Sequence, residues 1–217
     1  MEKFYDRHDA GKILAEELKP YANNANAIVL ALPRGGVPVA YEVAKTLSIP
    51  LDVFIVRKLG VPGHEELAMG AIASGDTVVF NEEIVSSFNI PASAIDSVIQ
   101  SEQQELQRRE STYRDNRPLP ILTDKTIILV DDGIATGATM RAAIKALRKH
   151  KPADIIVAVP VAALSTCEEM AGLADKIVCP LKPVNFYAVG LWYENFSQTS
   201  DDEVTELLAK ANQAINQ

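Results

Sequence analysis

One stretch, residues 126–139, restricts the possible folds of this chain more than any other. Its apolar and largely β-branched run, 126–130, ends in two carboxylates, Asp131 and Asp132. A loop of small residues and threonines follows, and 140–149 are good helix formers. Continuous apolar runs of this length are typical of buried parallel strands, and open α/β sheets bind ligands where such strands end. The stretch therefore predicts a strand, a ligand-binding loop and a helix.

The loop has the composition of a site for a phosphorylated sugar. Backbone N–H groups at a helix start, with the positive end of the helix dipole, suit a dianionic phosphate. Asp131 and Asp132 are placed to accept hydrogen bonds from the two hydroxyls of an attached ribose. No Gly-Lys-Ser/Thr follows, so this is not a Walker loop, and the dinucleotide fingerprint is absent as well. The alternative is a structural turn with Asp132 as an N-cap. The residues expected at the phosphate are Ala135, Thr136, Gly137, Ala138 and Thr139.

These residues carry a resemblance to a known family. Residues 128–139 resemble the phosphoribosyl-pyrophosphate (PRPP) motif of type I phosphoribosyltransferases, above all the adenine and orotate branches. The whole chain is similar to bacterial predicted phosphoribosyltransferases whose acceptor is not established. The resemblance implies transfer of a 5-phosphoribosyl group from PRPP to a nitrogen of a small acceptor, a nucleobase by analogy, with release of pyrophosphate. It also implies Mg²⁺ as cofactor, held by Asp131 and Asp132 through water. A catalytically silent PRPP sensor is the alternative.

A second anion site is predicted earlier in the chain. The apolar strand 27–32 is followed at once by a Pro-Arg-Gly-Gly turn, 33–36, and by a helix over 37–47. A basic glycine turn between a strand and a helix suits an anion, although a plain turn with an exposed arginine would look the same. In the resemblance this is the pyrophosphate loop, which implies a cis peptide between Pro33 and Arg34. The implied diphosphate-binding residues are Arg34, Gly35 and Gly36.

A pair of cations, Arg57 and Lys58, is expected at the end of a strand over 51–56. The pair resembles the Arg-Lys that opens the flexible catalytic loop of the orotate branch, so both are predicted to bind pyrophosphate and Lys58 to act in catalysis with Arg34, Asp131 and Asp132. A solvated strand edge is the alternative. Residues 60–70, rich in glycine, are predicted to form a mobile loop. Glu65 or Glu66 is a candidate acid/base there, or part of a solvated helix start.

The middle of the chain is predicted to be a helical insertion of residues 81–117. A hairpin over 71–80, turning at Gly75-Asp76, is expected to precede it, and residues 81 to about 114 are expected to be helical. The charge run Glu102 to Glu110 is most simply a solvated helix face. The insertion would serve as a lid or as a dimer surface, which leaves a homodimer open.

The C-terminal residues, 180–217, are expected to form the small hood that covers the sheet in the family. The hood is rich in aromatic residues and ends in a helix over 202–215. Phe186 and Trp192 are predicted to stack on the acceptor base, although a cluster that anchors the last helix is equally compatible. Where some purine branches place a catalytic Asp in the phosphate loop, this chain has Ala135, so that acid/base role is absent.

Strands alternating with helices predict one α/β domain over 1–217, with a doubly wound and mostly parallel sheet of the type I phosphoribosyltransferase kind. Further strands are expected over 154–160 and 176–179, and a first helix is expected over 9–18 with Asp9 as its cap. The net charge of −8 argues against a nucleic-acid partner. No apolar run is long enough for a membrane span, and no signal core begins the chain. Two unpaired cysteines favour a cytoplasmic protein.

Overall fold

The computed structural model describes residues 3–215, and contacts divide them into two compact units. The first unit takes its described residues from 1–53, 122–137 and 151–217, and the second takes them from 54–121 and 138–150. The single domain with an insertion over 81–117 and a hood over 180–217 stays a prediction. Among the described residues, no helix combines the length and the apolar character needed to cross a membrane.

The first unit is built on a five-stranded parallel sheet, as the alternation of strands and helices predicted. The strands lie in the order β2-β1-β6-β7-β8, and every neighbouring pair is parallel. All five residues of β1 are buried, which explains why this strand is apolar throughout rather than alternating. The strands are β1 (Ala27–Ala31), β2 (Leu51–Val53), β6 (Thr126–Val130), β7 (Asp154–Ala158) and β8 (Lys176–Val178).

The order of the strands reverses between β1 and β6. From β1 the chain moves to β2 on one side, and it later returns to β6 on the other side. Ala31 pairs with Val130 at the carboxyl ends of the two strands, and the Leu32 N–H donates to the Val130 carbonyl at 2.9 Å. The loops that follow β1 and β6 therefore leave the sheet next to each other. Open α/β sheets bind ligands at such a switch point.

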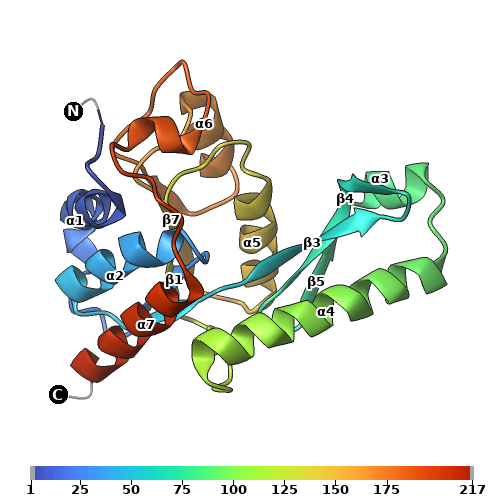
Figure 1. Ribbon diagram of the computed structural model, residues 1–217, viewed down its shortest axis with the longest axis horizontal. Coiled ribbons are helices and arrows are strands. Elements are labelled where there is room, and N and C mark those ends of the chain that lie inside the picture. The colour runs from blue at the N-terminus through green and yellow to red at the C-terminus, as the bar shows by residue number, and fades with distance from the viewer. Residues whose placement is uncertain (1–2, 216–217) are drawn as a thin grey trace. The chain divides into compact units, whose positions relative to one another are not determined.

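Helices of the first unit cover this sheet. α2 packs on β1, β2 and β6, and both α1 and α7 pack on α2 (Figure 1). The N-cap of α1 is Asp6, whose side chain accepts from the Asp9 N–H at 2.8 Å, so the prediction that Asp9 caps this helix is wrong. The helices are α1 (Arg7–Glu17), η1 (Lys19–Tyr21), α2 (Gly36–Leu47), α6 (Leu164–Ala171), η2 (Val189–Trp192) and α7 (Asp201–Ile215).

The N-terminal segment is paired with the aromatic C-terminal segment. The Phe4 N–H donates to the Trp192 carbonyl at 2.9 Å, and the Glu194 N–H donates to the Phe4 carbonyl at 2.9 Å. The side chains of Phe4 and Tyr193 are buried together in a small apolar cluster. These contacts bring the start of α1 beside residues 192–197.

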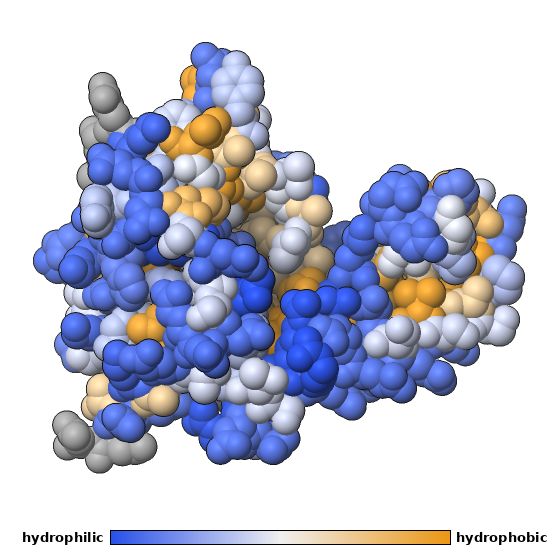
Figure 2. Space-filling model, viewed as in Figure 1, coloured by the Kyte–Doolittle hydropathy of each residue, from blue (hydrophilic) through white to orange (hydrophobic). Residues whose placement is uncertain are grey.

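The second unit contains a three-stranded antiparallel sheet in the order β3-β4-β5. The hairpin of β4 and β5 agrees with the prediction over 71–80, and Gly75 and Asp76 in its turn both have positive φ. In Figure 2, apolar surface (orange) is visible on the second unit. Phe88, directly after α3, is 43% exposed. The elements are β3 (Val56–Val61), β4 (His64–Ala73), β5 (Thr77–Phe80), α3 (Glu82–Ser87), α4 (Ala92–Arg114) and α5 (Ala138–Lys149).

Two predictions about this unit are wrong. The mobile loop over 60–70 is instead a β-hairpin, because Pro62 and Gly63 form a two-residue turn between the paired residues Val61 and His64. Gly63 has φ of +80°, which is the reason for a glycine after a proline in such a turn. The strand over 51–56 also divides, since β2 ends at Val53 and β3 begins the second sheet at Val56.

The helical stretch expected over 81–114 is formed by two helices. Asn81 caps α3 by accepting from the Ile84 N–H, and α4 begins only after Pro91. Asn89 between them has φ of +46°, outside the helical region, and the residue before a proline avoids the helical conformation. The chain therefore turns at residues 88–91 before α4 starts.

Candidate functional site

The loops after β1 and β6 touch each other at the switch point of the sheet. A Cβ atom added to Gly35 would lie 2.2 Å from Asp132 Oδ2, and one added to Gly36 would lie 2.9 Å from the Val130 carbonyl oxygen. No side chain fits at such distances, so both glycines are needed for the close approach. The structure thereby brings Gly35 and Gly36 together with Asp131 and Asp132.

Arg34 lies at the entry of this loop. The peptide bond between Pro33 and Arg34 is cis, as the resemblance implied. The side chain of Arg34 is 40% exposed, and its Nη1 atom lies 3.8 Å from Asp201 Oδ1 at the start of α7. An ion pair this long and this exposed holds the guanidinium only weakly. Arg34 can therefore turn to a bound anion at little cost.

Arg7, at the start of α1, is a site residue that the sequence did not reveal. Its Nε donates to Asp132 Oδ2 at 2.9 Å, with the two side chains 11% and 15% exposed. Its Nη1 donates to the Ser197 carbonyl at 2.6 Å, and its guanidinium lies 4.0 Å from the centre of the Phe196 ring. No periodicity or motif marks Arg7, and its partner is 125 positions away in the chain. Packing of the N-terminal and C-terminal segments alone makes this pair.

Tyr193 adds a second contact to Asp132. Its hydroxyl donates to the Asp132 backbone carbonyl, and burial raises the pKa of the phenol above its usual value. A phenol that stays protonated is a permanent hydrogen-bond donor. The backbone of Asp132 is thereby fixed from the C-terminal side while Arg7 fixes its carboxylate.

The two aspartates differ in their electrostatic surroundings. Burial raises the pKa of Asp131 well above its usual value, and the charge of Asp132 raises it further. Burial also raises the pKa of Asp132, although the Arg7 guanidinium opposes the shift. Arg7 has a smaller effect on Asp131, whose Oδ1 accepts instead from the Asp132 N–H at 2.8 Å. Burial thus disfavours the charged form of both carboxyl groups, and Arg7 offsets this mainly at Asp132.

The predicted phosphate loop has an open and polar surface. Ala135 and Thr136 are exposed, and Gly137 has φ of +81°, a conformation that favours glycine. The loop is continuous with the first turn of α5 in the second unit, where Ala138 and Thr139 are exposed as well. Exposed backbone at the start of a helix agrees with a phosphate site, and the roles of these five residues stay predictions.

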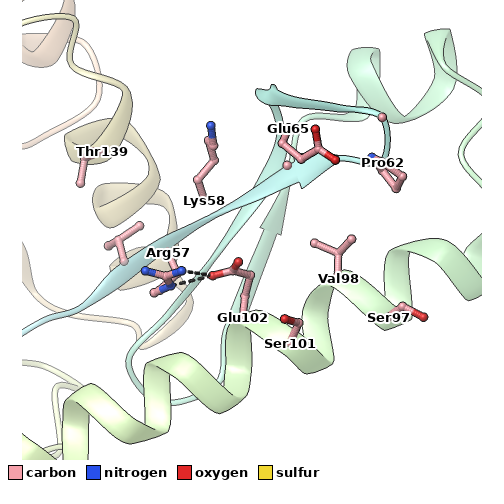
Figure 3. A pocket seen from close by; sticks show the side chains of 12 residues that line it. Arg57, Lys58, Pro62, Glu65, Ser97, Val98, Ser101, Glu102 and Thr139 are labelled. Atoms are coloured by element: carbon pink, nitrogen blue, oxygen red, sulfur yellow. Dashed lines mark hydrogen bonds and ion pairs between the residues drawn. The ribbon is translucent and has the colours of Figure 1, made fainter.

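In the second unit, Arg57 and Lys58 lie at the start of β3, not at the end of a strand. Arg57 donates from Nε and from Nη2 to Glu102 Oε2 on α4, both at 2.6 Å (Figure 3). Lys58 points away from Glu102 and is exposed, as alternation along a strand requires. The predicted solvated face of α4 is therefore wrong at Glu102, which is only 24% exposed.

The two candidate acid/base residues lie on β4 rather than in a loop. Glu65 lines the hollow of the second unit that is shown in Figure 3. Glu66 is 81% exposed and only 3.9 Å from His64 Nδ1. Glu65 is thus the better placed of the two, and an acid/base role stays a prediction.

Phe186 and Trp192 lie in the hood segment and face each other. Their ring centres are 6.4 Å apart with an interplanar angle of 17°, and both pack against the cluster of Phe4 and Tyr193. The cluster holds the C-terminal segment against the N-terminal one, whereas the structural alternative placed such a cluster against the last helix. Both side chains are half-buried, so each retains some exposed surface.

The residues present fit a magnesium ion that relies on substrate oxygens. Among residues 3–215, no group of three or more His, Cys, Asp or Glu is gathered for a metal. Mg²⁺ is usually held by one or two carboxylates, waters and substrate phosphates rather than by a full protein cage. Asp131 and Asp132 supply two adjacent carboxyl groups at the switch point of the sheet, so this donor set suits such an ion.

Comparison with known proteins identifies the family. A family model described as phosphoribosyl transferase domain matches residues 71–191, more than half of the chain. The chain belongs to this phosphoribosyl transferase family. The match includes the strand β6, the two aspartates and the loop up to α5, and it also includes the antiparallel sheet from Ala71 onward. Membership of the family agrees with the resemblance found in the PRPP motif.

Two curated relatives of this chain come from Mycobacterium tuberculosis, strains CDC 1551 and H37Rv. Each is 47% identical over 212 residues, and their names describe them as candidate phosphoribosyl transferases. The alignments cover 98% of this chain but 48% of each relative. The chain thus spans about half the length of these curated relatives.

Solved structures share the fold of this chain. The crystal structure of TT1426 from Thermus thermophilus is 37% identical with a TM-score of 0.84, covering 96% of this chain and 98% of that one. The purine phosphoribosyltransferase from Pyrococcus horikoshii is 18% identical with a TM-score of 0.50, covering 92% and 99%. The second likeness concerns the fold alone. The mostly parallel sheet with a small antiparallel sheet agrees with this comparison.

Proposed function

We propose that this chain transfers a 5-phosphoribosyl group from PRPP, with Mg²⁺, to a nitrogen of a small acceptor and releases pyrophosphate. One observation carries the proposal: the glycines after β1 lie directly against the aspartates after β6, at the switch point of a parallel sheet. A basic glycine turn and a carboxylate pair are thus neighbours, as a sugar with a diphosphate on one carbon requires. Membership of the family supports the same reaction.

The diphosphate would be bound by donors and cations. Arg34 supplies charge, and the backbone amides after it supply hydrogen bonds at Gly35 and Gly36. Arg57 and Lys58 are the further cations that the resemblance implies for the diphosphate. Such groups favour departure of pyrophosphate because they stabilise the negative charge that develops on its leaving oxygen.

The other end of PRPP would be bound by the loop after β6. The residues of this loop and of the first turn of α5, Ala135 to Thr139, would hold the 5′-phosphate with amides and hydroxyls. Asp131 and Asp132 would accept from the ribose hydroxyls and stabilise positive charge on the ring as the bond to pyrophosphate breaks. Fixing both ends of the sugar aligns its reacting carbon with the acceptor.

Asp131 and Asp132 would hold Mg²⁺ through water, and the ion would supply charge that neutralises the diphosphate and ribose oxygens. Arg7 has a separate task in this arrangement, since it keeps the Asp132 carboxylate in one orientation. Tyr193 does the same for the Asp132 backbone. Both contacts limit how far Asp132 moves when the sugar binds.

A nucleobase is the proposed acceptor. Phe186 and Trp192 have flat faces at the hood, and such faces stack on heterocycles with little loss of conformational entropy. The absence of an acidic residue at Ala135 favours an acceptor nitrogen that needs no help from a base at that position. Glu65 is the remaining candidate for such help.

The direct test is turnover. The full chain is incubated with PRPP, Mg²⁺ and a panel of purine and pyrimidine bases, and pyrophosphate release and nucleotide formation are followed together. Equal amounts of both products with one base support transfer to that acceptor. Binding of PRPP without any release would favour the PRPP sensor, and failure to bind PRPP at all would contradict the proposal.

A further inference from the structure

The second unit contains an open hollow between the hairpin of β3 and β4 and the helix α4 (Figure 3). Its volume is about 840 Å³, and small-molecule sites span roughly 300–1,000 Å³. Arg57 and Lys58 contribute from β3, Thr139 contributes from the start of α5, and Ser101 and Glu102 contribute from α4. Cations and hydroxyls suit an anionic ligand, whereas Glu102 carries a carboxylate into the same lining.

Glu102 is joined to the cation that an anion would need most. Two nitrogens of Arg57 donate to one oxygen of Glu102 at 2.6 Å, and both side chains are about three-quarters buried. The pair is therefore well formed and partly shielded from water. Lys58, by contrast, has no ion-pair partner among the residues that the structure describes and is open to solvent.

The same donors of Arg57 serve a carboxylate and a phosphate. A guanidinium binds either group through parallel N–H donors, so it cannot give its Nε and Nη2 atoms fully to both. Pyrophosphate carries more negative charge than one carboxylate and can displace it, at the cost of opening the pair. Glu102 must then weaken the binding of diphosphate relative to a chain without this charge.

We propose that Glu102 sets the affinity of this chain for diphosphate by competing with it for Arg57. The inference rests on the proposed function, in which Arg57 binds the diphosphate of PRPP. It makes Glu102, on α4, an affinity-determining residue of the hollow in the second unit. A carboxylate that returns to Arg57 also favours departure of the pyrophosphate product, and product release limits turnover in many enzymes.

The test measures pyrophosphate binding to the full chain by isothermal titration calorimetry, with and without Mg²⁺. Glu102→Gln keeps the size of the side chain and removes its charge. Glu105→Gln is the matched control, because Glu105 lies on the same helix but pairs with Arg108 and Arg109. Circular dichroism melts establish that each variant is folded.

Glu102→Gln is expected to bind pyrophosphate about tenfold more tightly, equivalent to about 1.4 kcal/mol, with Glu105→Gln unchanged. The gain should vanish in the double variant Arg57→Gln/Glu102→Gln, because the competed cation is gone. A purely structural pair would instead lower the melting temperature without tightening the binding.

Three results would overturn the inference. Unchanged or weaker pyrophosphate binding by a folded Glu102→Gln variant contradicts the competition, although PRPP binding by the parent chain would leave the proposed function standing. An equal gain in Glu105→Gln would trace the effect to net charge rather than to Arg57. Failure of the parent chain and all variants to bind either PRPP or pyrophosphate would overturn the proposed function and this inference together.

Discussion

Gly35 has no room for a side chain, because Asp132 Oδ2 would lie 2.2 Å from its Cβ atom. Gly35→Ala should therefore push the two loops apart and lower the free energy of unfolding by about 1–3 kcal/mol, the usual cost of overpacking. Transfer activity should fall strongly even in the fraction of the variant that stays folded, because Asp132 is displaced. Thermal melts and turnover with PRPP check both effects.

Gly172→Ala is the matched control for that substitution. Its φ is −80° and an added Cβ would make an ordinary contact of 3.4 Å with the Glu169 carbonyl, so little change is expected. Equal losses in the two variants, or full activity in Gly35→Ala, would contradict the close approach at the switch point.

The charge of Asp131 predicts a pH dependence of stability in the absence of metal. Burial and the charge of Asp132 raise the pKa of Asp131 in the folded chain above its usual value of 3.8. At pH values between the usual pKa and the raised pKa, the folded chain therefore binds more protons than the unfolded chain. Stability therefore falls as pH rises through this window and stays low above it. Asp131→Asn cannot ionise and should melt at a higher temperature than the parent at pH 8.

Melts in EDTA at a series of pH values measure this difference. For a chain of this size, each 1 kcal/mol corresponds to about 2–4 °C in melting temperature. The difference in melting temperature between Asp131→Asn and the parent should narrow as pH is lowered toward 4, because Asp131 of the parent then becomes uncharged as well. A lower melting temperature for the variant at pH 8 would refute the prediction. The gain in stability should accompany a loss of transfer activity.

At the scale of elements, α1 is tied to the hood segment by Arg7. This guanidinium contacts Asp132, the Ser197 carbonyl and the Phe196 ring, so one side chain joins α1, the loop after β6 and residues 196–197. Arg7→Gln leaves the Asp132 carboxylate without its cation in a largely buried place. The expected loss is about 3–5 kcal/mol of unfolding free energy, measured by urea denaturation.

Lys12→Gln is the control on the same helix, since Lys12 is exposed, and it should change stability by less than about 0.5 kcal/mol. Arg7→Lys keeps the charge but not the planar fork, so it should recover part of the stability. If Arg7→Gln were as stable as Lys12→Gln, the contacts of Arg7 would contribute nothing measurable to the free energy of unfolding.

At the scale of the whole molecule, PRPP should stabilise the folded chain when Mg²⁺ is present. A ligand at 100 times its dissociation constant adds about 2.7 kcal/mol, which corresponds to roughly 5–11 °C in melting temperature here. Differential scanning fluorimetry measures the shift. Ribose 5-phosphate, which lacks the diphosphate, should give a smaller one, and no shift with PRPP and Mg²⁺ would contradict the proposed function.

The main features of the first unit could be predicted from sequence because they are local. Each of the strands β1 and β6 is one apolar run, and each is followed directly by its polar loop. A strand and its candidate site residues are therefore consecutive in the sequence and can be predicted together. The second sheet could not be predicted in full. The glycines of residues 60–70 indicated mobility, whereas antiparallel pairing of β3 with β4 places Gly60 and Gly70 inside strands. Glycine allows both outcomes, and pairing decides between them.

The sequence by itself determined the parallel α/β class, the carboxylate pair with the small-residue loop after it and the basic glycine turn, because each depends on consecutive residues. Only the tertiary structure decided which charges meet. Arg7 pairs with Asp132, 125 positions away in the sequence, and Arg57 pairs with Glu102, 45 positions away. Such pairs depend on how helices pack against strands, and many acids on the chain were equally available by composition. Local chemistry fixes what a loop can bind, whereas packing fixes which partner each charge obtains.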